Sequence, residues 1–255
     1  MKIRGLVHVH STISFDGRLT LEQIRDLARA NGFGVVFITE HIESLKPVDL
    51  ERLIDQCRRV SRPDCLLIPG LEIEAQCQYF LGLTRPVPTT DFREARRQLL
   101  DLGAVGVLAH PHRMKRPLEP EERSWIRAVE IWNVKDDGGR VPGYVGYRMW
   151  KRWADPTSRP APIAGLDLHD LEGFRSIGIE IDVDHADAEA LLAAVREGRF
   201  RMWCNGSVFD PDSLAASQIV LGSMIWCLRR GFRAFQLKRV FPRGAPTIFK
   251  RLIKG

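Results

Sequence analysis

Histidines and carboxylates recur in small groups along the first two thirds of this 255-residue chain, and such groups can hold metal ions. The strongest local feature is His8-Val9-His10. Because side chains alternate along a β-strand, both imidazoles would lie on one face and could chelate one ion. An HxH pair also occurs often by chance, so the case for a metal site rests on the groups that follow it.

The other groups each stand at or just past the end of an apolar run that we expect to be a strand. If they were solvated surface residues, their recurrence after apolar runs would have no explanation. Imidazoles and carboxylates without thiolates suit Zn²⁺, Mn²⁺ or Fe²⁺. The groups are Asp16-Gly17, Glu40-His41, Glu72, His110-Pro111-His112 and Asp167-Leu168-His169.

Short apolar runs alternate with segments of helical spacing, which predicts a parallel sheet with crossover helices, closed or nearly closed into a barrel. The carboxyl ends of parallel barrel strands meet at one face, so these distant groups would converge in a single cleft. We expect strands at 3–10, 35–38, 65–69, 80–83, 105–109, 129–132 and 163–166, with 176–184 and 201–206 completing or flanking the barrel, and helices at 20–31, 48–60, 92–102 and 186–197.

The ordered set of motifs resembles the PHP (polymerase and histidinol phosphatase) family of metal-dependent phosphoesterases. The family pattern is an HxH, an Asp-Gly, an (Asp/Glu)-His, a Gly-x-Glu, a His-Pro and a late Asp-x-His, and all six occur here in that order. The resemblance covers roughly residues 3 to 175. It implies an α/β fold, a distorted (β/α)7 TIM-like barrel, that binds two or three divalent metal ions.

The resemblance also implies which residues hold the metals. His8, His10, Glu72 and Asp167 would hold one ion, Asp16, His41 and His169 a second, and Glu72 would bridge to a third ion shared with His110. The third site departs from the family pattern, because Tyr79 stands where relatives often have a histidine. A third ion would then be weakly bound, differently ligated or absent.

Several nearby residues are candidates for supporting roles. Glu40 would orient His41 from behind, although a surface acid that starts a helix is an equal alternative. Glu130, a carboxylate inside an apolar strand, would support a ligand histidine through hydrogen bonds. The residues expected to contact substrate are Arg18, His112 and Arg113; the alternative is that the two arginines are ordinary surface charges and that His112 caps a loop.

A metal centre of this kind predicts phosphoester hydrolysis by a metal-activated water, with no protein nucleophile. The chain contains neither a Gly-x-Ser-x-Gly elbow nor a P-loop. We expect the substrate to be a small phosphorylated metabolite or a nucleotide. The alternatives are a 3′–5′ exonuclease-like phosphodiesterase and a metal-binding scaffold without catalysis.

The net charge of +6 is concentrated at the C-terminal end. Residues 213–255 contain nine Lys or Arg and no Asp or Glu, so the rest of the chain carries about −3. We therefore expect a metallophosphoesterase domain at 1–212 and a basic, apolar tail at 213–255. The tail would pack on the barrel, contact an anionic membrane surface or, third in rank, bind nucleic acid.

Five scattered cysteines and a start without a signal-peptide pattern favour a reduced, cytoplasmic protein, membrane-associated only if the tail binds lipid. The apolar run 214–228 is shorter than the roughly 20 residues that a membrane-spanning helix needs.

Overall fold

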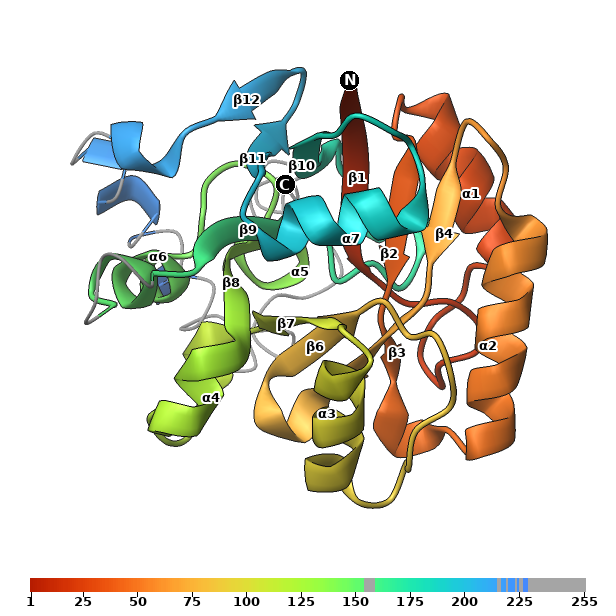
Figure 1. Cartoon of the computed structure of the whole chain (residues 1–255). Coiled ribbons are helices and arrows are strands. Elements are labelled where there is room, and N and C mark those ends of the chain that lie inside the picture. Colours follow the sequence, from red (N-terminus) through yellow and green to blue (C-terminus); the bar gives the residue numbers. More distant parts are fainter. Residues whose placement is uncertain (154–158, 215–216, 219, 223, 225–226, 229–255) are drawn as a thin grey trace, which may run out of the picture.

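A computed structural model describes residues 1–153, 159–214, 217–218, 220–222, 224 and 227–228. Its strands form two six-stranded sheets (Figure 1). The first sheet has the order β12 (Ser207–Phe209), β11 (Phe200–Cys204), β10 (Ile177–Asp182), β1 (Lys2–Val9), β2 (Val35–Ile38) and β4 (Leu66–Ile68). The second has the order β3 (Glu40–His41), β5 (Gly70–Ile73), β6 (Gln78–Leu81), β7 (Val105–Leu108), β8 (Ile126–Asn133) and β9 (Ala161–Gly165).

The two sheets are continuous with each other at their edges. Only Thr39 separates β2 from β3, and only Pro69 separates β4 from β5, so the chain passes directly from one sheet to the other. On the far side, the segment after β9 hydrogen-bonds to β1, with the Leu168 amide donating to the His8 carbonyl at 3.1 Å. The predicted α/β class is confirmed, and the strands that were expected in one barrel lie in these two linked sheets.

The expectation of parallel strands throughout is wrong. Strand β6 runs antiparallel to both β5 and β7, and β10 runs antiparallel to β1 and β11. The reason is local: β5 and β6 are joined by the single 3₁₀ turn η2 (Glu74–Gln76), closed by Cys77 at φ 55°, which is too short for a crossover. This hairpin places Tyr79 directly opposite Glu72.

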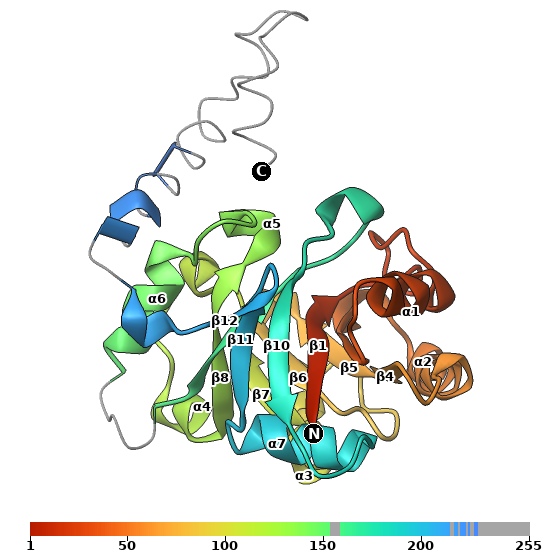
Figure 2. The same ribbon diagram turned by 90° about the horizontal axis from the view of Figure 1, so that it is seen from above.

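Four helices lie where the spacing predicts them: α1 (Leu21–Ala30), α2 (Pro47–Val60), α3 (Phe92–Asp101) and α7 (Ala188–Arg196). Three of them start with ordinary capping chemistry, since the side chains of Thr20, Asp91 and Asp187 accept hydrogen bonds from first-turn amides, and α2 starts with Pro47 at its first position. The helices α4 (Pro120–Trp125), α5 (Val134–Asp137) and α6 (Tyr144–Lys151) were not predicted, and all are short. In Figure 2, α5 lies at the end of the molecule opposite the N-terminus, where β1 and β8 finish.

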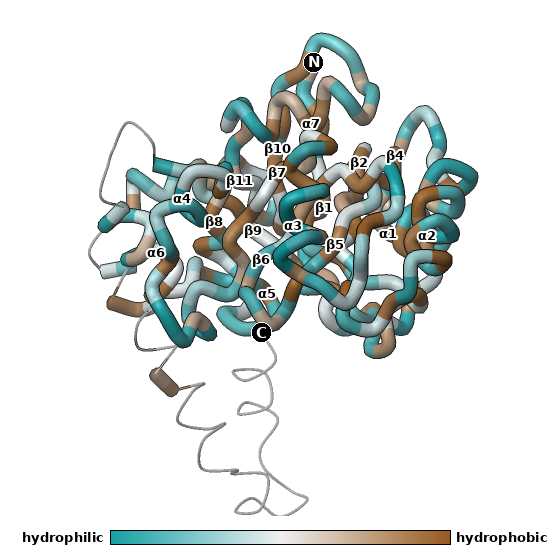
Figure 3. Tube along the Cα trace, turned by 60° about the horizontal axis from the view of Figure 1, so that its bottom comes forward, coloured by the Kyte–Doolittle hydropathy of each residue, from teal (hydrophilic) through white to brown (hydrophobic). Residues whose placement is uncertain are grey.

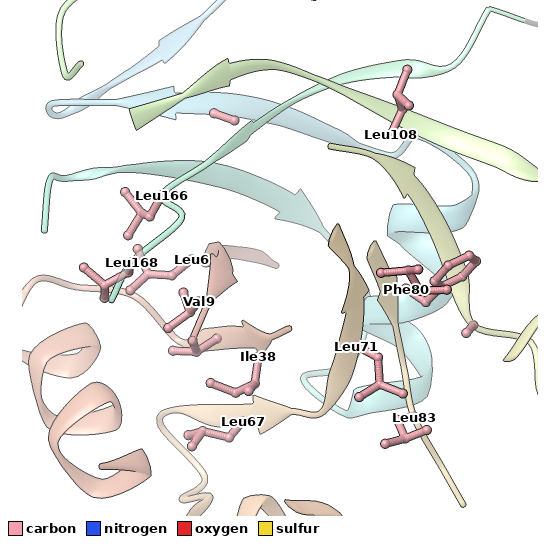
Figure 4. Close-up of a cluster of buried hydrophobic side chains, with 14 of the residues drawn as sticks. Leu6, Val9, Ile38, Leu67, Leu71, Phe80, Leu83, Leu108, Leu166 and Leu168 are labelled. Atoms are coloured by element: carbon pink, nitrogen blue, oxygen red, sulfur yellow. The ribbon is translucent and has the colours of Figure 1, made fainter. Parts of the chain in front are cut away.

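The core fills both sides of the central strands. Every residue of β2 is buried, and the hydropathy view shows hydrophobic strands inside a hydrophilic outer layer of loops and helix surfaces such as α3 (Figure 3). Leu6, Val9 and Ile38 of the first sheet lie in one cluster with Leu71 and Phe80 of the second (Figure 4). These packed strands position the polar groups of the candidate site.

The five cysteines are free, and Cys57, Cys65 and Cys77 are buried. Most of the predicted tail lies outside the described residues. Those of its residues that are described from 217 onward are helical, and the side chains of Val220, Leu221, Met224 and Leu228 are each at least half exposed. Within the described part of the chain, no helix is both long and apolar enough to cross a membrane.

Candidate metal centre

The backbone bends at three of the predicted ligands. His8, His110 and Asp167 adopt left-handed φ angles of 63°, 41° and 50°, which are uncommon for non-glycine residues and often occur at functional sites. At His8 this coincides with a register shift between Leu6 and Val9 in the pairing of β1 with β2. Simple strand alternation therefore does not describe the HxH pair, yet the two imidazole rings still lie 5.2 Å apart.

Glu72 lies at the middle of the cluster and is fully buried. Its Oε2 atom is 3.2 Å from His8 Nε2, 3.3 Å from His10 Nε2 and 3.3 Å from His41 Nδ1. Its Oε1 atom is 3.2 Å from His110 Nε2. One carboxylate from β5 thus meets four imidazoles that come from three separate segments of the chain.

Asp167, which follows β9, contacts three of the same imidazoles. Its Oδ1 lies 3.7 Å from His8 Nε2 and 3.6 Å from His10 Nε2, and its Oδ2 lies 3.7 Å from His110 Nε2. The two carboxylates therefore bracket three histidines.

Asp16 forms an adjoining group at the mouth of the site. Its Oδ2 lies 2.8 Å from His169 Nε2 and 3.5 Å from His41 Nε2. The His10 ring packs against those of His41 and His169, with centroid distances of 4.3 and 4.4 Å, and the His41 and His169 centroids are 6.0 Å apart. All eight predicted ligands therefore lie in one continuous cluster, and the sets His10–Asp16–His41–His169 and His8–His10–Glu72 each bring their ligand atoms close enough to share an ion.

Many of these buried polar atoms have no hydrogen-bond partner, which a metal ion would supply. The unpartnered atoms include His8 Nε2, His10 Nε2, His41 Nδ1, both oxygens of Glu72 and Asp167 Oδ2. An unsatisfied buried polar atom costs about 1–3 kcal/mol, and a charged one costs more. Such a concentration at one point fits residues that bind divalent metal.

The electrostatics suit the same chemistry. Burial opposes the charged forms, but neighbouring histidines lower the pKa of Glu72 well below its usual range and that of Asp167 to about 2, so both carboxylates are ionised. Burial lowers the pKa of His10 to about 4, which leaves its imidazole neutral, as a metal ligand must be. Burial lowers the pKa of His8 and His110, but nearby carboxylates outweigh it and raise both, so a metal ion that binds these two imidazoles must displace a proton from each.

Glu130 on β8 accepts hydrogen bonds from two of the ligand histidines, at atoms other than those that face Glu72. Its Oε1 accepts a 2.8 Å hydrogen bond from His8 Nδ1, and its Oε2 accepts bonds from Asn133 Nδ2 at 2.9 Å and from the His110 amide at 3.3 Å. The His8–Glu130 bond directs the other ring nitrogen, Nε2, toward Glu72 and Asp167.

Glu40 is fully buried, so the alternative that it is a surface acid is wrong. Its carboxylate does not contact the His41 ring. It accepts hydrogen bonds from the amides of Ser11 and Ser14 at 3.0 and 3.1 Å and from both hydroxyls, and the Ser14 hydroxyl in turn accepts from the His41 amide at 3.0 Å. Glu40 therefore fixes the loop after β1 and, through Ser14, the backbone of His41.

Sequence reasoning missed Asp136 and Lys135 on α5. Asp136 Oδ2 lies 3.2 Å from His110 Nδ1, 3.2 Å from His112 Nε2 and 2.8 Å from Arg113 Nη2. Lys135 Nζ lies 3.5 Å from Asp167 Oδ1. Their position directly after the Glu130-containing strand was the signal, since the other chemical groups also follow strand ends.

The remaining predicted residues fall around this centre. His112 and Arg113 contact Asp136, while the Arg18 side chain is exposed and only its amide contacts the site, donating to the His169 carbonyl at 2.8 Å. Tyr79 is fully buried with its ring 4.7 Å from that of His8, and its hydroxyl has no hydrogen-bond partner.

No protein-family model matches the chain, and a sequence comparison with curated proteins finds no significant match.

Solved structures do resemble it. A two-domain protein from Bacteroides vulgatus that contains a predicted PHP-like metal-dependent phosphoesterase superposes with a TM-score of 0.61 at 17% identity, over 89% of this chain and 70% of that one. The chain has the PHP-like fold. PsfC from Pseudomonas syringae superposes with a TM-score of 0.55 at 14% identity, over 89% of this chain and 98% of that one.

The resemblance to PHP-like phosphoesterases is thus confirmed in the fold, at identities that carry no residue-level assignment. The PHP-like fold of this chain carries clusters of histidine, aspartate and glutamate that could hold metal.

Proposed function

We propose that this chain is a metal-dependent phosphoesterase that hydrolyses a small phosphorylated metabolite or a nucleotide. The observation that carries the proposal is the set of three histidine nitrogens, from His8, His10 and His41, within 3.3 Å of one oxygen of the buried Glu72. The fold shared with PHP-like phosphoesterases supports the reaction class.

We infer that two ions share the ligands in the partition that the family resemblance implies, with Glu72 between them. His8, His10, Glu72 and Asp167 would hold one, and Asp16, His41 and His169 the other, with His110 available for a third through Glu72. The ligand atom of His10 also lies close enough to those of the second set to join it. Divalent ions held about 3.5–4 Å apart lower the pKa of bound water and neutralise phosphoryl charge. The imidazole and carboxylate donors favour Zn²⁺, Mn²⁺ or Fe²⁺.

A neighbouring pocket supports an organic substrate. A cavity of about 660 Å³ lies between α6 and residues 111–118 and borders Pro111, which joins His110 to His112. Its lining combines apolar and aromatic side chains such as Met114, Tyr144 and Trp153 with five cations and no acid, a mixture suited to a ligand with both apolar and anionic parts. The cations are Lys115, Arg116, Arg123, Arg148 and Arg152, of which Arg116 already pairs with Glu122.

The decisive experiment measures metal content together with hydrolysis of a panel of phosphomonoesters, phosphodiesters and nucleotides. Wild type should contain two or more equivalents of metal and hydrolyse at least one member. The double variant Asp167→Ala/His169→Ala should lose both. The matched control is Asp184→Ala/His185→Ala, an exposed acid-histidine pair beyond β10 that includes the one histidine outside the site. Wild-type protein without metal and without turnover would refute the proposal.

The same panel separates the alternatives. Activity on oligonucleotides in preference to mononucleotides would favour the exonuclease-like phosphodiesterase. Stoichiometric metal without turnover would favour the scaffold.

We also propose that residues 213–255 form a unit apart from the domain at 1–212 and that they bind anionic membrane surfaces. The supporting observations are the exposed apolar residues Val220, Leu221, Met224 and Leu228, followed by a sequence with nine cations and no acid. The full chain should co-sediment with vesicles containing phosphatidylserine but not with pure phosphatidylcholine vesicles, and a Leu221→Ser/Met224→Ser variant should bind less. Equal binding to both vesicle types, or to neither, would contradict this.

A further inference from the structure

Lys135 brings a cation to the candidate metal centre. Its Nζ atom lies 3.5 Å from Asp167 Oδ1 and 3.3 Å from each ring nitrogen of His169. In the described part of the chain, no other Lys or Arg forms a salt bridge with Asp16, Glu72 or Asp167. The side chain is 44% exposed, whereas that of Asp167 is 2% exposed, so Lys135 stands between the buried ligands and solvent.

The fold holds Lys135 at this position through α5. This single helical turn follows β8 directly and is capped by Asn133, whose side chain accepts from the Asp136 amide at 3.0 Å. Its other end is closed by the Gly138 amide, which donates to the Val134 carbonyl at 2.8 Å, with Gly138 at φ 84°. Val134 is buried beneath the turn, so the backbone of Lys135 is fixed on both sides.

Two further cations near the centre, Arg113 and Arg18, are compensated or directed elsewhere. Arg113 Nη2 lies 2.8 Å from Asp136 Oδ2, and its Nη1 lies 3.9 Å from Glu74 Oε1. The Arg18 side chain is exposed, with only its backbone amide bonded to the site. Neither places a charge against Asp167 and His169, as Lys135 does.

Metal binding would change what Lys135 contacts. A lone pair of His169 that coordinates a metal is no longer available to the ammonium group, and the metal's charge would repel Nζ from Asp167. A four-carbon side chain that is nearly half exposed can then move its charge outward by rotation. That movement would carry the ammonium toward the position from which an anionic substrate approaches the metals.

We propose that Lys135 binds the phosphoryl group of the substrate and stabilises the charge on its non-bridging oxygens during hydrolysis. The proposal rests on the proposed function, because it needs a phosphate ester at this centre. Cations that contact the phosphoryl oxygens where charge develops are a principal source of catalysis in phosphoryl transfer. In this role Lys135 is a catalytic residue that contacts the substrate, whereas the histidines and carboxylates bind the metals.

The test uses inorganic phosphate as the probe, titrated calorimetrically into the metal-loaded full chain. Lys135→Met should weaken phosphate binding by about 10- to 100-fold, the usual effect of removing one charge-assisted hydrogen bond. Metal content and thermal midpoint should stay at wild-type values. Lys135→Arg should recover part of the affinity because it restores the charge with a different geometry.

The matched control is Lys2→Met, which removes a lysine paired with Glu180 at the opposite end of β1. It should leave phosphate binding unchanged. For any ester that wild type hydrolyses, Lys135→Met should also lower kcat/KM.

Two results would overturn the inference while leaving the phosphoesterase proposal intact. One is phosphate affinity in Lys135→Met within about twofold of wild type. The other is loss of metal in that variant, which would make Lys135 a structural partner of the ligands. Failure of the phosphoesterase proposal would look different, because wild type itself would then lack metal and turnover.

Discussion

Replacing Glu130 by glutamine tests whether buried support of the histidines controls metal binding. Glu130 accepts three hydrogen bonds, from His8 Nδ1, Asn133 Nδ2 and the His110 amide. An amide keeps the shape but turns one acceptor into a donor. If the amide nitrogen faces Asn133 and His110, two donors lose their partner. If it faces His8, the imidazole proton must move to Nε2, which is the atom that faces Glu72.

Either arrangement has a calculable cost. Loss of a hydrogen bond to a buried charged group costs about 1.5–3 kcal/mol, and a stranded donor adds to it, so we expect Glu130→Gln to lower the free energy of unfolding by about 2–4 kcal/mol. Metal affinity should fall by about 10- to 100-fold, as for other residues that orient a ligand histidine. Urea denaturation of the metal-free protein and metal titration against a competing chelator measure the two quantities separately.

Glu180→Gln is the matched control. Glu180 is also poorly exposed, but its partners Lys2 and Arg201 are more than half exposed, so its loss should cost less than about 1 kcal/mol. The Glu180→Gln variant should bind metal with the affinity of wild type. The reasoning fails if Glu130→Gln matches Glu180→Gln in both stability and metal affinity.

Three further predictions follow from particular contacts. Gly165→Ala should lower metal affinity by at least about 10-fold in the same chelator titration, because its Cβ would lie 1.9 Å from Glu130 Oε1 and displace the partner of His8; unchanged affinity would contradict this. Saturating metal at 100 times Kd should stabilise the chelated protein by about 2.7 kcal/mol per site, seen as a rise in Tm that Asp167→Ala/His169→Ala lacks and Asp184→Ala/His185→Ala retains. Hydrogen bonds from Arg116 lower the pKa of Glu122 to about 2 from an ordinary value of 4.5, so the stabilisation from this ion pair is present above pH 4.5 and is lost as the pH falls toward 2. The difference in urea midpoint between wild type and Glu122→Gln should therefore shrink between pH 4.5 and pH 2. A difference that does not change with pH would argue against the ion pair.

Much of the fold could be predicted because local chemistry decides it. The apolar run at 35–38 is a strand of those bounds, and the helix start at Thr20 follows from its capping box. Short elements such as α5 and α6 escaped prediction because a few residues carry no clear periodicity. The antiparallel placement of β6 escaped as well, since the turn at Glu74–Gln76 had not been recognised as a hairpin connection.

The sequence by itself determined which residues could form a metal centre. Histidines and acids that follow apolar runs must gather wherever strand ends meet, and the PHP-like order of motifs added the expected partition among ions. That logic needs only the identity and spacing of residues such as His8, His10 and Asp167.

Only the tertiary structure decided how these groups face one another. The left-handed backbone at His8, the bonds from Glu130 and the approach of Lys135 to His169 depend on contacts between residues 34 or more positions apart. Local propensities carry no information about such contacts, because they form only when packed strands bring distant segments together. The acidity of Glu72, the neutrality of His10 and the charge at the mouth of the site arise in the same way, from burial and neighbours that the folded chain alone provides.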